Sequence, residues 1–252
     1  MKKGKSILII GESCTVHTFE TKGYDQFVNI RYSEPARMFI KIIEATGNKV
    51  THIPAHMVPD VFPNTLELLK KYDAVLVSDI GANTFLLHPD TMRFGKRTPN
   101  LLKLIREYVK QGGGFAMIGG YMSFMGVEGK ARYKGTPIEE LLPVELMQYD
   151  DRVEVPEGAD IKVDPSIHPI LKDMPREWPY ILGYNKLKEK TDAKVLINFE
   201  SDPILTIGEY GEGRTVAWAT DCSPHWMPEQ FYKWAHYPKL WDRIIEYLCG
   251  EY

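Results

Sequence analysis

The sequence has few cysteines, no long apolar run and no excess of basic residues. Its 252 residues include Cys14, Cys222 and Cys249, an odd and small number that excludes a disulfide scaffold. No stretch of 18 apolar residues occurs, and the basic N-terminal residues lead directly into an expected strand, not into a signal sequence. The net charge of -3 gives no general attraction to nucleic acid or to anionic membranes. We therefore expect a cytoplasmic protein with reduced thiols and with neither nucleic acid nor membrane as a partner.

A nucleophile is missing from the stretch around which the sequence is organised, residues 111–129. Gly112, Gly113 and Gly114 precede Phe115–Ile118, a short apolar run typical of a buried strand. The run ends in Gly119-Gly120 and re-enters a helical pattern, which is the geometry of a nucleophile elbow. Glycine stands where the nucleophile would be. What remains is a glycine turn ahead of a helix, whose amide groups favour a bound anion.

The first half of the chain alternates apolar runs with amphipathic segments. Strands are expected at Ser6–Ile10, Lys49–Ile53, Ala74–Val77 and Phe115–Ile118, and helices after Ser33, around Asn64–Lys71 and from Thr98 onward. Residues 11–17 are expected to form a polar loop, residues 24–32 a longer connection and residues 84–97 a long loop. This β-α-β-α-β-α-β order predicts a parallel sheet with right-handed crossovers.

After residue 150 the expected elements change from alternating strands and helices to a series of short strands. Short strands are expected at Asp151–Val155, Ile161–Val163, Tyr180–Leu187, Val195–Phe199 and Ile204–Tyr210, followed by a hairpin turn at Gly211–Gly213. Thr215–Ala219 is expected to rejoin the main sheet, and Trp241–Leu248 to form a closing helix. Because no linker interrupts the chain, we predict one domain over residues 1–252 with an antiparallel insertion at about 150–210. The predicted class is α/β, a three-layer flavodoxin-like parallel sheet with an antiparallel β extension in the C-terminal half.

Three segments carry a resemblance to a known family. The segment GGGFAMIGGYMSF resembles the strand, elbow and helix of the class I glutamine amidotransferase-like superfamily, in which the strand ends in a catalytic cysteine. The same register places Gly119 on the cysteine position, with Gly120 as the near alternative. YDAVLVSDIG resembles the strand and glycine loop that supply oxyanion donors, and TVAWATDCSPHWMPE resembles the strand and loop that carry the histidine. GES…KGYDQF and TDCSPHW more specifically resemble an uncharacterised branch named glutamine amidotransferases after the fold.

The resemblance implies a catalytic role for His225, although its usual partner on the elbow is missing. Glutamine hydrolysis by this fold needs a thiolate on the elbow, and glycine supplies none. Two relocated nucleophiles are candidates, Cys222, which with His225 follows an expected strand end, and Ser123, which follows the elbow. The alternative interpretations are a small buried thiol beside Pro224 and a serine that caps a helix. An active amidotransferase or hydrolase with a relocated nucleophile is therefore one hypothesis.

A binding site without covalent chemistry is the leading hypothesis. Polar residues at strand ends share the carboxyl edge of a parallel sheet, where such folds bind ligands. The candidate ligand-binding residues are Glu12, Ser13, Asp79, Gly81, Gly119, Gly120, Tyr121 and Arg132. Each has a structural alternative, a cap, a packed ring or a solvated basic loop. We expect a small polar or anionic ligand and, at most, non-covalent acid–base chemistry by His225.

Metal and cofactor binding are not expected, and self-association is. Cys14/His17 and Cys222/His225 form two Cys-x-x-His pairs, but on loops expected to lie on different strands, so no metal site is predicted. No G-x-G-x-x-G follows a strand, so no dinucleotide cofactor is predicted. Seven aromatic residues from Trp226 to Trp241 are too dense for a plain surface. Some are expected in the core, and the rest form either a homo-oligomer contact or an apolar wall of the pocket. A structural oligomer subunit is thus the third hypothesis.

Overall fold

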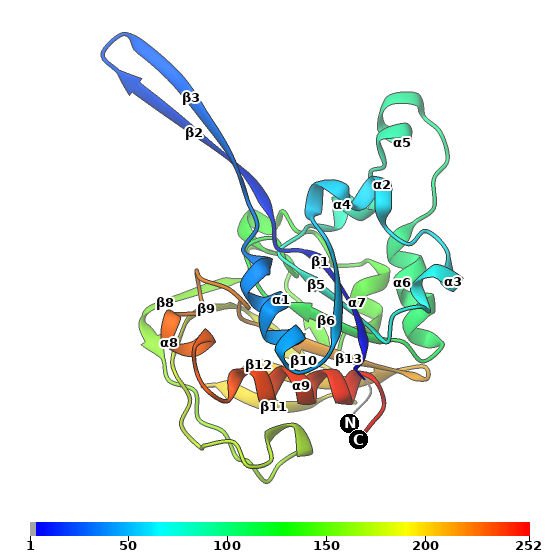
Figure 1. Ribbon diagram of the computed structural model, residues 1–252, viewed down its shortest axis with the longest axis vertical. Helices are drawn as coiled ribbons and strands as arrows, with labels where there is room; N and C mark the ends of the chain where they lie inside the picture. The colour runs from blue at the N-terminus through cyan, green and yellow to red at the C-terminus, as the bar shows by residue number, and fades with distance from the viewer. Residues whose placement is uncertain (1–3) are drawn as a thin grey trace.

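A seven-stranded sheet occupies the centre of the computed structural model, which describes residues 4–252 (Figure 1). The strand order is β11-β12-β13-β6-β5-β1-β4. Five strands are parallel to one another: β1 (Ser6–Gly11), β4 (Lys49–Ile53), β5 (Ala74–Ser78), β6 (Gly114–Ile118) and β13 (Gly213–Trp218). β12 (Asp202–Tyr210) and β11 (Lys194–Phe199) continue the sheet antiparallel on one side. This mixed α/β architecture is compatible with a flavodoxin-like fold.

The expected parallel strands are confirmed, and the inner ones are deeply buried, whereas β4 at the edge of the sheet is only partly so. Every residue of β5 and β6 is buried, as is β1 from Ile7 onward. Strands covered on both faces read as continuous apolar runs, which is why the sequence signal was clear. The expected return of residues 215–219 to the main sheet is also confirmed, because β13 pairs with β6 in parallel.

Amphipathic helices pack against this sheet and against one another. Helix α1 (Ala36–Ala45) lies beside α9 (Tyr237–Leu248), where the rings of Phe39 and Trp241 meet edge to face at 4.6 Å. Helix α6 (Leu101–Lys110) packs near α3 (Leu66–Leu69), α4 (Ala82–Leu86) and α7 (Pro137–Leu141). The remaining helical turns are α2 (Val58–Val61), α5 (Pro89–Phe94), α8 (Glu229–Tyr232) and the 3-10 turns Ala55–Met57, Val127–Gly129 and Pro169–Leu171. Within residues 4–252, no helix combines the length and the hydropathy that crossing a bilayer requires.

Two of the expected loops contain regular structure. Residues 84–97, expected to be a loop, contain the end of α4 and all of α5. Residues 14–33 form a β ribbon of β2 (Cys14–Lys22) and β3 (Asp25–Ser33), joined by a two-residue turn. The expectation of a polar loop at 11–17 and of a connection at 24–32 was therefore wrong. Ser33 does not cap a helix either, because it ends β3, and α1 begins after Pro35 without a side-chain cap.

The C-terminal half contains short antiparallel pairs as well as strands of the main sheet. β7 (Val144–Leu146) pairs with β10 (Leu187–Glu189), and β8 (Arg152–Ala159) pairs with β9 (Ile181–Asn185). The strand expected at Ile161–Val163 is only an isolated bridge between Lys162 and Glu177.

The aromatic cluster near the C-terminus belongs mainly to the core. Trp226, Phe231, Tyr237 and Trp241 are each at most 1% exposed, and Tyr232 and Trp234 are partly buried against the same core. Their density reflects packing of the loop and α9 beneath the sheet, so this cluster does not supply the free surface expected of it.

Candidate functional site

The backbone after β6 has no room for a side chain at either glycine of the bend. A Cβ on Gly119 would lie 2.2 Å from the carbonyl oxygen of Ala219, on the neighbouring strand end, and 2.8 Å from that of Thr220. A Cβ on Gly120, where φ is +148°, would lie 2.9 Å from Oδ1 of Asp79. At Gly119 both oxygens belong to the backbone, so a side chain would force the backbone to shift and packing requires glycine. At Gly120 the close atom belongs to the Asp79 side chain, and the positive φ is the stronger reason for glycine.

The amide groups of this bend are already used within the protein. The Gly120 amide donates to Oδ1 of Asn185 at 2.9 Å, and Asn185 Nδ2 donates back to the Gly120 carbonyl at 3.2 Å. The amide of Met122 donates to Oδ1 of Asp79 at 2.7 Å. No α-helix follows, because residues 121–126 form turns ahead of the 3-10 turn Val127–Gly129. The expected anion site above the elbow is therefore wrong in its geometry: its amides face Asn185 and Asp79.

Ser123 holds the bend together. Its hydroxyl donates to the carbonyl of Ile118 at 2.5 Å and accepts from the Asp79 amide at 3.1 Å, and the residue is 1% exposed. A hydroxyl whose proton is committed to a backbone carbonyl inside the core is poorly placed to attack a substrate. The observed role is structural, although it is not the helix cap that the sequence suggested.

Glu12 stands at the end of β1 as a buried carboxyl group. Its Oε2 accepts a hydrogen bond from Ser78 Oγ and its Oε1 from Ser223 Oγ, both at 2.6 Å. Burial raises the pKa of Glu12 well above its ordinary value, and the nearby charges of Asp221 and Asp79 raise it further. Glu12 therefore keeps its proton at pH values at which an exposed glutamate is ionised.

Asp79 and Asp221 complete a group of three carboxyls at the ends of β1, β5 and β13. Burial raises the pKa of Asp79 to about 6; the Met122 amide opposes this shift and Asp221 adds to it. Asp221 Oδ1 accepts hydrogen bonds from the amides of Cys222 at 2.7 Å and Ser223 at 3.1 Å. These contacts fix the Asp221 carboxylate with its other oxygen directed along the loop toward His225.

His225 combines a carboxylate contact with an aromatic surround. Its Nδ1 lies 3.8 Å from Oδ2 of Asp221, and its side chain is 41% exposed. The imidazole stacks on the ring of Trp226 with a centroid separation of 5.2 Å. It meets the ring of Tyr121 edge to face with a centroid separation of 4.4 Å. The hydroxyl of Tyr121 donates to Glu154 Oε1 at 2.9 Å, so the phenol presents its ring and not its oxygen to the histidine.

A pocket of about 200 Å³ joins these groups. It is lined by Glu12, Pro35, Asp79, Tyr121, Asp221, Ser223, Pro224 and His225. Four predicted site residues therefore come together here: Glu12, Asp79, Tyr121 and His225. The other predicted residues lie elsewhere. Ser13 accepts a hydrogen bond from the Ala55 amide, Gly81 caps α4 beside Met122, and Arg132 is exposed and does not line the pocket.

Nearly the whole chain matches one protein family. The model of a family described as "Putative glutamine amidotransferase" matches residues 6–250. The chain belongs to this family. Two solved structures are very similar to this chain. They are "Cytoplasmic Protein STM3548 from Salmonella typhimurium" (42% identity, TM-score 0.93, 96% of this chain and 98% of that one) and "Cytoplasmic Protein STM1381 from Salmonella typhimurium LT2" (43%, 0.92, 96% and 99%).

A more distant likeness shows the fold alone. A "Putative thua-like protein" from Parabacteroides merdae ATCC 43184 aligns over 99% of this chain and 91% of its own at 12% identity, with a TM-score of 0.59. No curated protein matches the chain. What this member of the amidotransferase family does must therefore be argued from its own site.

Cys222 is a poor nucleophile in this amidotransferase-family protein. The thiol is fully buried, and its Sγ lies 3.7 Å from Ser78 Oγ. Burial raises the pKa of Cys222 well above its ordinary value, and the charges of Glu12 and Asp221 raise it further. Reactive cysteines need the opposite environment, since the thiolate is the attacking form. The structure therefore argues against a relocated thiol at this position.

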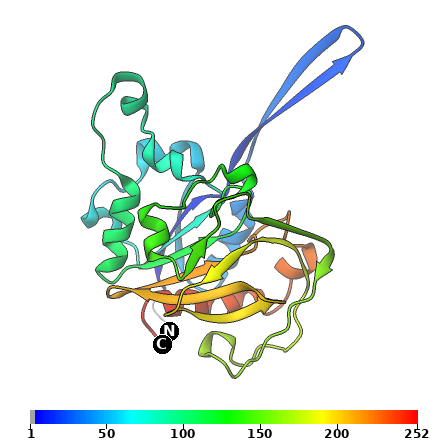
Figure 2. The ribbon, with the colours of Figure 1, turned by 180° about the vertical axis from the view of Figure 1, so that it is seen from behind.

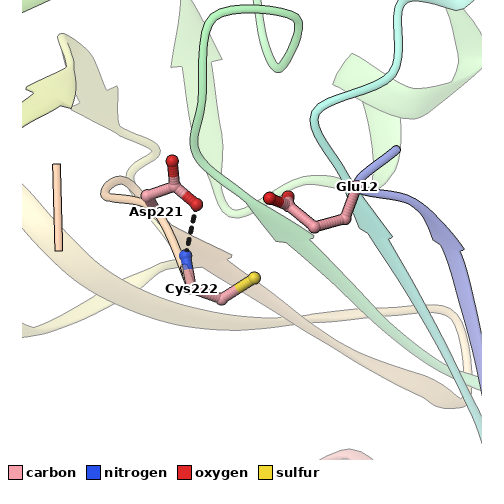
Figure 3. Close-up of side chains that lie close together, drawn as sticks. All are labelled: Glu12, Asp221 and Cys222. Atoms are coloured by element: carbon pink, nitrogen blue, oxygen red, sulfur yellow. Dashed lines mark hydrogen bonds between the residues drawn. The ribbon is translucent and has the colours of Figure 1, made fainter. Parts of the chain in front are cut away.

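A metal centre built on the same residues is disfavoured by its hydrogen bonds. Ligand atoms of Glu12, Asp221 and Cys222 lie within 4.8 Å of one another (Figure 3). Both Glu12 oxygens already accept serine hydroxyls, and Asp221 Oδ1 accepts two amides. These donors occupy acceptor positions on three of the oxygens, and the raised pKa of Cys222 disfavours the thiolate that binds a metal, so the set fits protons better than a metal. Within residues 4–252, no close set of ligand atoms includes Cys14 or His17, so the two Cys-x-x-His pairs do not converge.

Several residues of the site were not singled out in the sequence. Asp221 and Ser223 hold the loop after β13, Ser78 supports Glu12, and Asn185 fills the bend. Ser78 and Asp221 could have been found, because each is a polar residue at or just after the end of a buried strand. Asn185 gave no such signal, since it reaches the bend from the antiparallel pair β8-β9, whose placement the sequence does not encode locally.

Proposed function

We propose that this amidotransferase-family protein binds a small polar molecule in the pocket between Asp79, Asp221 and His225 and forms no covalent intermediate. The observation that carries this proposal is the bend at Gly119 and Gly120, where a Cβ would lie less than 3 Å from neighbouring oxygens. Covalent glutaminase chemistry needs a thiolate at that point of the fold. The pocket beside the bend remains, with acceptors and an imidazole that need no neighbouring nucleophile to be useful.

The chemistry of the pocket favours a ligand rich in hydrogen-bond donors. Asp79 and Asp221 offer carboxylate oxygens, and the rings of Tyr121 and His225 form one wall. Carboxylates accept hydrogen bonds from hydroxyl or ammonium groups and repel anions. We therefore narrow the sequence-based expectation of a polar or anionic ligand to an uncharged polyhydroxy compound or a primary amine that fits about 200 Å³. Arg132, the one cation expected to attract an anion, lies away from the pocket lining.

A second, catalytic role is favoured by the Asp221–His225 pair. The Asp221 carboxylate lies 3.8 Å from Nδ1 of His225, which leaves Nε2 as the ring nitrogen available to a ligand. In this arrangement His225 acts as a general base toward a ligand hydroxyl or amine, and Asp79, with a pKa of about 6, exchanges the proton near neutral pH. General acid–base help of this kind is worth roughly 10²–10⁴-fold in rate, so turnover does not require a nucleophile.

Further parts of the proposal concern the whole chain. The fold forms three layers in flavodoxin-like order as one domain, with the antiparallel strands at about 150–210 as an insertion. The names of the two similar Salmonella proteins include the word cytoplasmic, which supports the same location for this chain. The chain also forms a homo-oligomer, through surfaces outside this pocket.

Ligand-dependent thermal stability tests the binding proposal. Galactose, glycerol and ethanolamine serve as donor-rich probes, with citrate and inorganic phosphate as anionic ones. A ligand at 100 times its Kd stabilises the folded state by about 2.7 kcal/mol, which shifts the melting temperature measurably. We expect stabilisation by at least one donor-rich probe, its loss in Asp221→Asn and His225→Ala, and its retention in the control Arg132→Ala. Stabilisation by the anions alone, lost in Arg132→Ala, would overturn the proposal, and so would ammonia release from glutamine.

A further inference from the structure

The β2-β3 ribbon leaves the body of the protein with one apolar face uncovered. Figures 1 and 2 show, from opposite sides, that the ribbon extends away from all other elements. It begins two residues after Glu12 and ends two residues before Pro35, and both of those residues line the pocket. Near its root the ring of Tyr32 meets that of His56 at 5.3 Å. Beyond that point every ribbon residue outward to the turn is exposed except Val16 and Glu20, which are partly so.

The register of the ribbon separates its residues into two chemically different faces. Directly opposed residues of an antiparallel pair lie on the same face, and successive residues alternate. Phe19 is opposed to Val28, His17 to Ile30 and Thr15 to Tyr32, which puts most of the apolar side chains on one face. The opposite face carries the pairs Thr18/Asn29, Val16/Arg31, Glu20/Phe27 and Lys22/Asp25, so it is mixed, with Phe27 as its one large ring. Phe19 is 76% and Ile30 63% exposed, so the apolar face has no cover within the chain.

A second uncovered apolar surface lies on residues 57–94. Of the sixteen most exposed large hydrophobic side chains within residues 4–252, six lie on the ribbon and six on this segment. Met92 and Phe94, on α5, are 64% and 67% exposed. A hollow of about 90 Å³ lies between α2, α4 and the start of α5, lined by apolar Val58, Phe62, Phe85 and Leu101 and by polar side chains that include Asp60 and His88. We call the surface of α2, α4 and α5, with this hollow, the receiving surface.

The two surfaces belong to one chain but are separate within it. The ribbon and α5 project from the body in different directions (Figure 1), and β2 and β3 make no extended contact with any other described element. An isolated two-stranded hairpin is at best marginally stable in water. A long, exposed and apolar ribbon of this kind therefore requires a partner, and the matching surface on the same chain identifies that partner as another copy.

We propose that two copies of this chain clasp one another, the apolar face of each β2-β3 ribbon packing on the receiving surface of the other copy. The areas are consistent with a two-fold dimer. A strand of nine residues is about 30 Å long and two strands are about 10 Å wide, so one ribbon face covers roughly 300 Å². A single contact of about 300 Å² is too small for a stable interface. Two contacts related by symmetry bury roughly 600 Å² on each copy, and the flanks of the ribbon bring this near the ~800 Å² typical of a stable interface.

Sedimentation velocity of the full chain over a wide concentration range tests this proposal. The wild-type protein is expected to sediment as a dimer. Phe19→Glu/Ile30→Glu places two carboxylates on the apolar face and is expected to weaken dimerisation by on the order of a hundredfold. Thr18→Glu/Asn29→Glu adds the same charges one residue away, on the opposite face, and is expected to remain dimeric. Met92→Glu, on the receiving surface, is expected to weaken the dimer as well.

Each alternative outcome overturns the clasp. A wild-type chain that is monomeric at all concentrations would do so, and so would a dimer that Phe19→Glu/Ile30→Glu leaves intact. A dimer sensitive to the ribbon variant but not to Met92→Glu would replace the receiving surface by another contact. Because all substituted residues are exposed and lie outside the central sheet, each variant should unfold cooperatively like the wild type, and its far-ultraviolet circular dichroism should differ by no more than the signal of the ribbon strands. The clasp rests on the homo-oligomer of the proposed function and names its interface, so a monomeric chain would overturn both. A dimer that the ribbon variant leaves intact would overturn the clasp alone, and the ligand assay of the pocket does not depend on either result.

Discussion

Asp221 Oδ2 faces Nδ1 of His225 across 3.8 Å, while Oδ1 of the same carboxylate is held by two amides of its own loop. One side chain thus shapes the loop after β13 and orients the imidazole. It also raises the pKa of its neighbours, because its charge opposes ionisation of Glu12 and Asp79. A substitution at Asp221 should therefore change the pKa of Glu12, the pKa of Asp79 and the position of the His225 ring.

The first prediction concerns the pH dependence of stability. The pKa of Asp79 is 3.8 ordinarily and about 6 in the folded protein, so the folded state binds the proton more tightly than the unfolded state. The stability that this proton contributes is complete below pH 3.8 and is lost as the pH rises through about 6. Buried Glu12 has a shift of the same sign. We expect urea unfolding midpoints to fall over this range.

Neutral substitutions check that assignment. Asp79→Asn is expected to flatten the fall in stability, and Asp221→Asn to move it to lower pH by removing the charge that raises the pKa of Asp79. Asp164→Asn, on a fully exposed group far from the pocket lining, serves as the control and should leave the fall near pH 6 unchanged. A fall that persists unaltered in Asp79→Asn and in Asp221→Asn would show that the Asp79 proton is not its source.

The second prediction concerns the bend. Gly119→Ala places a methyl group against the carbonyl of Ala219, and we expect a loss of about 2–4 kcal/mol in the free energy of unfolding. Gly95→Ala is the matched control, since Gly95 has φ of +62° but open space around its Cα. Its expected cost is only the left-handed backbone penalty of about 1–2 kcal/mol. Equal losses in the two variants, measured by chemical denaturation, would show that close packing is not what requires glycine.

The third prediction concerns Asn185, the buried amide that pairs with Gly120. Asn185→Ala removes its bonds to both backbone groups of Gly120 and to Asp151. Leaving buried partners unsatisfied costs about 1–3 kcal/mol, and we expect the upper part of that range in the free energy of unfolding, measured by urea denaturation. Asn198→Ala, on an exposed side chain with one bond to the Glu200 carbonyl, is the control and should cost about 1 kcal/mol or less. Similar losses in the two variants would mean that the hydrogen bonds of Asn185 do not stabilise the bend.

The fourth prediction concerns thiol reactivity. Cys14 is exposed on the ribbon, whereas Cys222 is fully buried. Burial raises the pKa of both thiols, and that of Cys222 lies well above its ordinary value, so the difference in access decides which thiol reacts. Native protein treated with iodoacetamide should be modified at Cys14 and not at Cys222, as read by peptide mass spectrometry. Denatured protein provides the control, in which Cys222 reacts as well. Rapid native labelling of Cys222, or labelling by a glutamine analogue, would revive the relocated-nucleophile hypothesis.

The central sheet could be predicted from the sequence because its strands are covered on both faces. Ile7–Ile10, Val75–Val77 and Phe115–Ile118 read as continuous apolar runs for that reason. The ribbon was missed although its pattern was visible: Val16, Phe19, Val28 and Ile30 are β-formers on either side of a Gly23-Tyr24 turn. Residues 11–17 were expected to form a loop and residues 24–32 a connection, because a strand without a buried face lacks the continuous apolar signal that marked the others.

The candidate site was predictable in part for a similar reason. Glu12 and Asp79 directly follow apolar strands, so their meeting at the sheet edge follows from topology. Asp221 follows the same rule and was overlooked beside Cys222 and His225. The use of the elbow amides by Asn185 and Asp79 could not be predicted, since it depends on side chains that approach from distant parts of the chain. The expectation of free surface in the aromatic cluster was wrong, because a high density of aromatic residues in the sequence does not distinguish a buried core from an exposed surface.

The close approach of the Ala219 carbonyl to Gly119 also limits what mutation can achieve in this lineage. A single codon change to cysteine would introduce a thiol into space that the adjacent strand end already occupies. Both clashing oxygens belong to the backbone, so replacing a neighbouring side chain would not make room for the thiol. Pro224 and His225 are exposed at the pocket, so substitutions there can change what binds without moving the backbone of the sheet.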